Sequence, residues 1–149
     1  MRNYFIRYDP EAKVNLNYIL MLYGIAEHNS YSKRYDYIPY TTKKELAAKL
    51  KDVYGDKAMS YSTLWRLLYT IEYTKYIEDQ GSMLYLHNNF ANRANTEKQP
   101  FIILTDKEAD FLIDKGDSLL TSYYCYIKYY CKLAEYAGRT QDFTAKQFL

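Results

Sequence analysis

Histidine and glycine are scarce in this chain of 149 residues, which holds 2 His and 5 Gly. Rolling-circle nucleases need paired histidines to hold a metal ion, and tyrosine recombinases need an Arg and His cluster around the phosphate. His28 and His87 form no His-x-His pair, and the glycines form neither a Walker loop nor a phosphate cradle. We therefore expect no enzymatic activity, no metal and no cofactor, despite the 20 tyrosines.

The chain also has few cysteines and no long apolar run. Cys125 and Cys131 lie six residues apart, which turns them about 240° from each other on a helix, so they cannot pair within it. Without a CxxC motif or a signal peptide after Met1, reduced thiols are expected. No apolar run approaches the ~20 residues of a membrane span. The sequence therefore predicts a cytoplasmic protein without membrane contact.

Charge is distributed unevenly along the chain. Residues 1–75 hold 12 Lys and Arg against 8 Asp and Glu, a net charge of +4, whereas residues 76–149 hold 8 against 10, a net charge of −2. Cations in the first half would neutralise phosphates and give a salt-dependent affinity for DNA. A solvated lysine-rich face is the alternative. The cations concerned are Lys43, Lys44, Lys49, Lys51, Lys57, Arg66 and Lys75.

A short amphipathic helix is expected to begin at Thr42. Thr42 and Glu45 have the spacing of a capping box, in which two side chains close the first turn of a helix. Gly55 is placed to end this helix. The side chains expected to be buried are Leu46, Leu50 and Val53.

A second helix follows, with Ser60 as its N-cap. Within residues 62–73 an apolar stripe repeats at i, i+3, i+4 and i+7, and the opposite face carries side chains that can reach base edges and phosphates. The stripe is Leu64, Leu67, Leu68 and Ile71, and the opposite face is Ser62, Arg66, Tyr69 and Tyr73. Together the two helices predict a helix-turn-helix, with double-stranded DNA as partner. The candidate DNA-binding residues are Thr42, Lys43, Lys44, Ser60, Tyr61, Ser62, Thr63, Arg66, Tyr69 and Tyr73.

The elements around these two helices complete the order of a winged helix. A short strand at 4–8 and a helix at 12–27 precede them, and residues 29–40, rich in Ser and Tyr, are interpreted as a loop. Residues 76–79 and 83–87 flank a Gln-Gly-Ser turn, as in a β-hairpin. We therefore expect an α+β fold, mainly α with a small β-hairpin. Residues 1–95 would form a winged-helix DNA-binding domain whose wing carries the acidic Glu78 and Asp79.

A polar stretch at 88–99 predicts a linker before a second unit at 100–149. This unit begins with a strand at 101–104 and a helix that Thr105 and Glu108 cap and that Gly116 ends. A longer helix then extends to about residue 137. Its expected apolar stripe is Leu119, Leu120, Tyr123, Ile127, Tyr130 and Ala134.

Residues 143–149 match residues 40–46 in register at aromatic, Thr, Lys and Leu positions. This indicates a pseudo-repeat whose second copy, a truncated winged-helix unit, stops at its first helix. The long tyrosine-rich helix is either core or the seam of a homodimer, for which Tyr124, Tyr129 and Tyr136 on its remaining faces are the reason.

The tandem organisation, the segment SYYCYIKYY at 122–130 and the closing DFTAKQFL at 142–149 resemble plasmid and phage replication-initiator proteins of low-GC Gram-positive bacteria. The resemblance implies paired winged-helix domains that bind origin repeats, often dimerise and recruit other replication proteins. The second domain would lack its recognition helix and wing, so functions that depend on it stay open.

Other interpretations fit the same patterns. A transcriptional regulator would have the same first domain, and a winged helix can instead serve protein association through an exposed aromatic patch. That patch would consist of Trp65, Tyr61, Tyr69 and Tyr73. The carboxylates of Asp106, Glu108, Asp110 and Asp114 could hold a cation, but the i, i+4 spacing of Asp106 and Asp110 is typical of a solvated helix face.

Overall fold

The computed structural model describes residues 2–28, 35–87 and 101–136, which form a mixed α+β fold with small antiparallel sheets. The helices are α1 (Leu16–Ile25), α2 (Lys43–Tyr54), α3 (Tyr61–Tyr69), α4 (Asp106–Lys115) and α5 (Ser118–Tyr136), with short 3-10 turns η1 (Gly55–Lys57) and η2 (Ile71–Lys75). The strands are β1 (Asn3–Arg7), β2 (Glu27–His28), β3 (Tyr35–Pro39), β4 (Ile77–Asp79), β5 (Met83–His87) and β6 (Phe101–Thr105). The α+β class is therefore confirmed.

A four-stranded antiparallel sheet in the order β2-β3-β5-β4 includes the expected hairpin. Strand β3 corrects the loop interpretation of residues 35–39, because Ile38 is 1% exposed and pairs with Leu84 of β5. Strand β2 pairs only with Asp36 and Tyr37 of β3 and does not extend as far as Pro39. Pro39 is therefore tolerated at the end of β3, because a backbone N–H at this position would have no strand beside it to bond on that side.

The second sheet joins the first strand of the chain to a strand about 100 residues later in the sequence. Strand β1 pairs with β6 in antiparallel register from Asn3 opposite Thr105 to Arg7 opposite Phe101. Helices α4 and α5 both contact α1, and one cluster of buried side chains includes residues from β1, α1, α2, α4 and α5. The strand, and the helices that follow it, thus pack on the fold assigned to residues 1–95. The expected boundary at 95–100 and the repeat at 143–149 lie outside the described residues.

Local signals set most of the helix ends as expected. The side chains of Thr42, Ser60 and Thr105 accept hydrogen bonds from the backbone N–H groups of Glu45, Thr63 and Glu108, respectively. At Thr105 the full capping box forms, because the Glu108 side chain also accepts a hydrogen bond from the N–H of Thr105. In α2 the carboxylate of Glu45 instead accepts from the N–H of Thr41, not from that of the N-cap residue Thr42. Gly116 ends α4 with a φ of 63°, which glycine adopts without steric cost.

Three boundaries differ from expectation. Helix α1 starts at Leu16 rather than near residue 12, because the side chain of Asn15 caps it by accepting from the N–H of Asn17. It ends at Ile25, before β2. Helix α3 ends at Tyr69, where Thr70 takes an extended conformation with ψ 122°, and residues 71–75 wind as a 3-10 turn.

Two side chains expected in the core are exposed. Ile71 is 78% exposed, because the end of α3 at Tyr69 removes it from the stripe that buries Leu64 and Leu67. Val53 is 59% exposed. Tyr54 takes the inward position at the end of α2, with its hydroxyl so close to Gly24 that a Cβ there would displace it.

Helix α5 is rotated from its expected orientation. Thr121 and Cys125 are buried, whereas three members of the expected stripe, Leu119, Leu120 and Ile127, are exposed. Ala134, the last member of that stripe, is buried as expected. The rotation follows from specific inward contacts, above all a hydrogen bond of 2.6 Å from the Thr121 hydroxyl to the side-chain oxygen of Asn17, both of which are buried. A buried polar group is costly without a partner, so this bond selects the inward face.

The cysteines have the expected free form. Cys125 and Cys131 make no disulfide, and burial raises the pKa of the Cys125 thiol to about 12. Among the helices within the described ranges, none offers an apolar stretch long enough to cross a bilayer.

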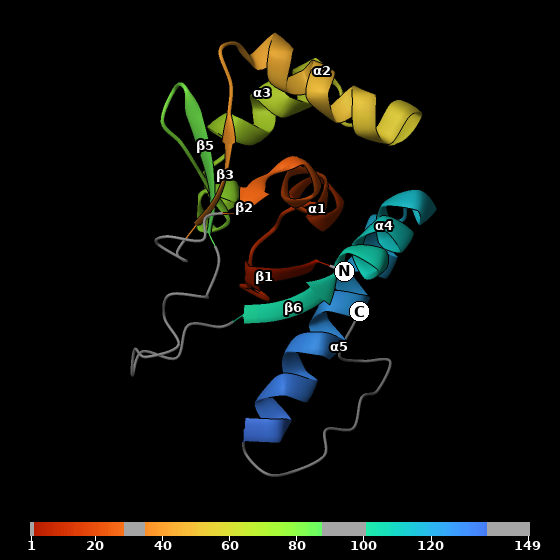
Figure 1. Cartoon of the computed structure of the whole chain (residues 1–149). Coiled ribbons are helices and arrows are strands. Elements are labelled where there is room, and N and C mark those ends of the chain that lie inside the picture. Colours follow the sequence, from red (N-terminus) through yellow and green to blue (C-terminus); the bar gives the residue numbers. More distant parts are fainter. Residues whose placement is uncertain (1, 29–34, 88–100, 137–149) are drawn as a thin grey trace.

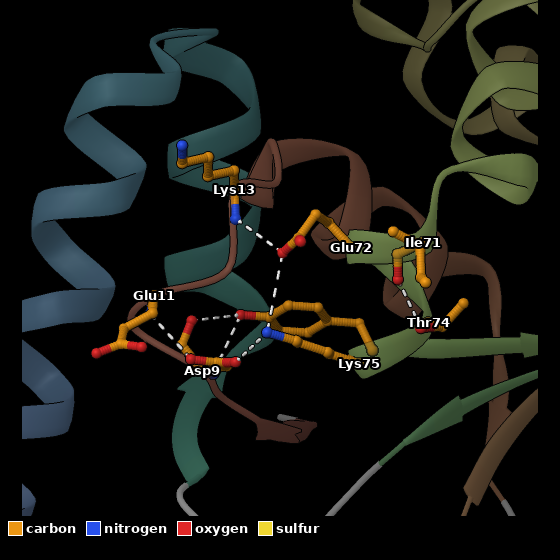
Figure 2. A network of polar contacts seen from close by, with 8 residues as sticks. Asp9, Glu11, Lys13, Ile71, Glu72, Thr74 and Lys75 are labelled. Carbon is orange, nitrogen blue, oxygen red and sulfur yellow. Dashed lines mark hydrogen bonds and ion pairs between the residues drawn. The ribbon is translucent and has the colours of Figure 1, made fainter.

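A polar network fixes the chain just after α3 to the segment before α1 (Figure 2). The ammonium of Lys75 lies 2.8 Å from the carboxylate of Asp9 and 3.8 Å from that of Glu72, which also accepts from the N–H of Lys13. The hydrogen bond from Lys75 holds the pKa of the Asp9 carboxyl below its usual value. The buried Tyr76 donates its hydroxyl to the carbonyl of Asp9.

Candidate nucleic-acid interface

One side of α3 is open to solvent. Ser62, Arg66 and Tyr69 follow each other at i, i+4 and i+7, and all three are exposed. The guanidinium of Arg66 forms no hydrogen bond or ion pair with the described part of the chain, so its charge is available to a partner. Leu64 and Leu67, 0% and 3% exposed, hold the opposite side of α3 in the core.

The first turn of α3 is closed by its own side chains. The hydroxyl of Ser60 accepts from the N–H of Thr63 and lies 2.9 Å from the Thr63 hydroxyl and 3.2 Å from that of Ser62. Ser60 and Thr63 therefore act first as a cap. Tyr61, 40% exposed, continues the open side of the helix.

The start of α2 lies beside α3. Lys44 is exposed, and the ammonium of Lys43 lies 4.2 Å from the ring centre of Trp65 and 5.8 Å from that of Tyr69. The structure thus brings Lys43 of α2 beside the aromatic rings of α3. Figure 1 shows α2 and α3 together at one end of the molecule, with the β4–β5 hairpin next to them.

The rings of Tyr61, Trp65 and Tyr69 form an aromatic ladder along α3. The ring of Trp65 stacks on that of Tyr69, with centres 5.3 Å apart, and meets the ring of Tyr61 edge-on at 6.2 Å. Trp65 was not among the residues expected to contact DNA. The i, i+4, i+8 spacing of three aromatic residues was the available signal for this ladder.

Three residues that were expected to contact DNA bases or phosphates make contacts within the fold instead. Tyr73 belongs to η2, not to α3, and its hydroxyl accepts from the N–H of Asn15 at 2.9 Å, so the structure does not bring it to the exposed side. Lys49 donates to the carbonyl of Pro39 and lies 3.6 Å from the carboxylate of Glu45. Lys75 is paired with Asp9. These two lysines therefore offer little free charge for phosphate binding.

The hairpin beside α3 carries negative charge. Glu78 and Asp79 of β4 are exposed. The Asp79 carboxylate accepts hydrogen bonds from the Tyr40 hydroxyl and from the backbone N–H of Gly81. Gly81 forms the turn of the hairpin with a φ of 86°. Burial, together with the hydrogen bond to Asp79, raises the pKa of Tyr40. The cationic surface is therefore made by α2 and α3 rather than by the hairpin.

A groove of about 430 Å³ separates the end of α3 from β4. The residues that line it include Leu67, Leu68, Tyr73, Glu78, Asp79 and His87. Burial lowers the pKa of His87, which favours its neutral form. The two carboxylates make this groove unsuitable for a phosphate.

The acidic helix α4 uses two of its carboxylates inside the fold. Asp106 accepts from the N–H of Arg2 at 3.1 Å, a hydrogen bond that keeps the pKa of its carboxyl low. Glu108 accepts from the N–H of Thr105 and pairs with Lys128 at 2.9 Å. Within residues 2–28, 35–87 and 101–136, no three His, Cys, Asp or Glu side chains gather as metal ligands would.

Compared with known proteins, the chain matches no family model, no curated protein and no solved structure.

Proposed function

We propose that this protein binds double-stranded DNA sequence-specifically through a winged helix. The observation that carries the proposal is the exposed side of α3, where Ser62, Arg66 and Tyr69 project from a helix anchored by buried leucines. An α-helix of this kind fits the major groove, where side chains reach base edges.

The arrangement of elements supports this proposal. Helix α1, strand β3, helices α2 and α3 and the β4–β5 hairpin follow one another as in a winged helix, with β5 between β3 and β4 in the sheet. Helix α3 would be the recognition helix and the hairpin the wing. The acidic Glu78 and Asp79 would keep the wing away from the phosphates.

The side chains suit distinct roles at a duplex. The free guanidinium of Arg66 matches a guanine edge, to which it can donate two hydrogen bonds, and Ser62 can donate to or accept from any base edge nearby. Lys43 and Lys44, together with the N-terminal turn of α2, suit phosphates, which fix position rather than sequence. Of the ten residues expected to contact DNA, Tyr73 has no place in this scheme.

The resemblance of residues 122–130 and 142–149 to replication initiators favours a role in plasmid or phage replication initiation. A transcriptional regulator would use the same DNA-binding step. The aromatic ladder favours one further candidate, a protein-association surface, since Tyr69 is 72% exposed and stacked on Trp65.

DNA binding predicts a specific salt dependence. Fluorescence anisotropy with labelled duplexes of random sequence should show saturable binding at about 50 mM salt. Lys43 and Lys44 together imply about two phosphate contacts, so affinity should fall roughly 10-fold by about 200 mM salt. Lys44→Ala should reduce the slope of log affinity against log salt by about 1.

The matched control is Lys107→Ala, an exposed lysine of α4, which should leave the slope unchanged. Failure of the parent protein to bind any duplex at the lower salt concentration would refute the proposal. The same conclusion follows if both lysine variants change the slope equally.

A further inference from the structure

The aromatic ladder of α3 ends in a ring that is open to solvent. The rings of Trp65 and Tyr69 stack with their planes only 14° apart, yet Tyr69 is 72% exposed. A ring that is so exposed while one of its faces is stacked presents its other face to water. Large aromatic side chains usually bury this surface, so the ladder offers a flat π surface to a partner.

Positive charge lies beside the ladder. The ammonium of Lys43 is within 6 Å of two ring centres, 4.2 Å from that of Trp65 and 5.8 Å from that of Tyr69. The carboxylate of Glu45, one turn or less further along α2, is already engaged by Lys49 at 3.6 Å. The π surface is therefore bordered by a cation whose charge no carboxylate of its own helix turn cancels.

The ladder and the side chains proposed to read a duplex begin on different sides of α3. On an ideal helix, Trp65 and Tyr69 lie about 40° and 80° round from Tyr61, whereas Ser62 and Arg66 lie about 100° and 140° round. A base within a duplex has both faces covered by its neighbours, so a ring stacks on it only after it leaves the stack. The ladder therefore suits unpaired bases, not the edges of paired ones.

We propose that the aromatic ladder binds single-stranded nucleic acid, with an unpaired base stacked on the open face of Tyr69 and phosphates next to Lys43 and Lys44. Every base has a π face and every nucleotide a phosphate, so rings bordered by cations match both parts of a single strand whatever its sequence. This inference goes beyond duplex binding and does not depend on it.

Trp65 is the only tryptophan of the chain, so its fluorescence reports on the ladder directly. Thymine oligonucleotides of about 12 residues do not pair with themselves and therefore probe single-strand binding alone. Added to the whole chain at about 50 mM salt, they should quench this fluorescence to saturation, and more weakly as salt rises. A uridine oligonucleotide of the same length shows whether the ladder prefers DNA or RNA, and binding of either supports the proposal.

Two substitutions separate stacking from simple apolar contact, with binding followed by the anisotropy of a labelled thymine oligonucleotide. Tyr69→Leu keeps an apolar side chain but loses the π face, so affinity should fall about 5-fold or more. Tyr69→Phe keeps the ring and should bind like the parent. An abasic oligonucleotide of equal length keeps the phosphates without the bases, and it should bind at least about tenfold more weakly.

Phe111 of α4 provides the matched control elsewhere on the surface. It is also an exposed aromatic residue, at 55%, with the ammonium of Lys115 5.3 Å from its ring centre. The exposed carboxylates of Asp110 and Asp114 lie on the same helix and would repel phosphates. Phe111→Leu should therefore leave the affinity for the thymine oligonucleotide unchanged.

The outcomes for single strands and for duplexes are independent. A parent protein that binds neither oligonucleotide overturns this inference, whether or not it binds a duplex, and leaves a protein-association role for the ladder. Equal affinity of Tyr69→Leu and Tyr69→Phe, or equal affinity for the abasic and the complete strand, also overturns it. Quenching by the thymine oligonucleotide in a protein that binds no duplex would support this inference and refute only the proposal of duplex binding.

Discussion

Leu67→Ala should destabilise the protein by about 2–5 kcal/mol, the usual cost of truncating a fully buried leucine to alanine. Leu67 is 3% exposed and belongs to the core cluster, on the side of α3 opposite its open side. Its loss removes apolar contacts and leaves a cavity that the rigid surroundings fill only partly. Because small domains have only about 5–15 kcal/mol of stability, this is a large share. Urea unfolding followed by circular dichroism measures the change.

The matched control for Leu67→Ala is Ile71→Ala, which removes a similar side chain from the same expected stripe. Ile71 is 78% exposed, so its truncation should change the free energy of unfolding by no more than about 0.5 kcal/mol. Similar losses in both variants would mean that α3 continues beyond Tyr69 and that the position of its exposed side is wrong.

Arg66→Ala should weaken binding to a preferred duplex by about 1–3 kcal/mol, roughly 5- to 150-fold, without lowering the unfolding temperature appreciably. The reason is that the exposed guanidinium makes no hydrogen bond or ion pair within the described residues, so its truncation affects only the bound state. A duplex selected from a random pool by the parent protein, titrated by fluorescence anisotropy, provides the measurement.

Arg66→Lys sharpens this prediction, because lysine keeps the charge but loses the planar pair of donors. If Arg66 reads a base, the lysine variant should lose discrimination between the selected duplex and a scrambled one. If it contacts only a phosphate, both duplexes should be bound nearly as before. Unchanged affinity in Arg66→Ala would remove Arg66 from the interface.

The features that the sequence predicts well depend on neighbouring residues. The caps at Thr42, Ser60 and Thr105 involve side chains and N–H groups three residues apart, and Gly116 ends α4 through its own backbone conformation. Such interactions do not depend on how distant segments pack. The exposed side of α3 could be predicted for the same reason as far as Tyr69.

What the sequence does not predict depends on distant segments. The pairing of β1 with β6 joins residues about 100 positions apart, and β3 is recognisable as a strand only beside β5. The face that α5 turns inward is set by the bond between Thr121 and Asn17, 104 residues away, which no periodicity of α5 alone reveals. The removal of Tyr73 from the DNA-binding set likewise depends on its contact with Asn15.

The central claim, that the exposed side of α3 meets duplex DNA, is tested most directly by a ¹H–¹⁵N chemical-shift map of the ¹⁵N-labelled chain titrated with the selected duplex. We predict that the largest amide shifts will occur in residues 61–69 and at Lys43 and Lys44, with small shifts in α4 and α5. Saturable binding with the amides of α3 unmoved, and the shifts concentrated in residues 106–136, would contradict it.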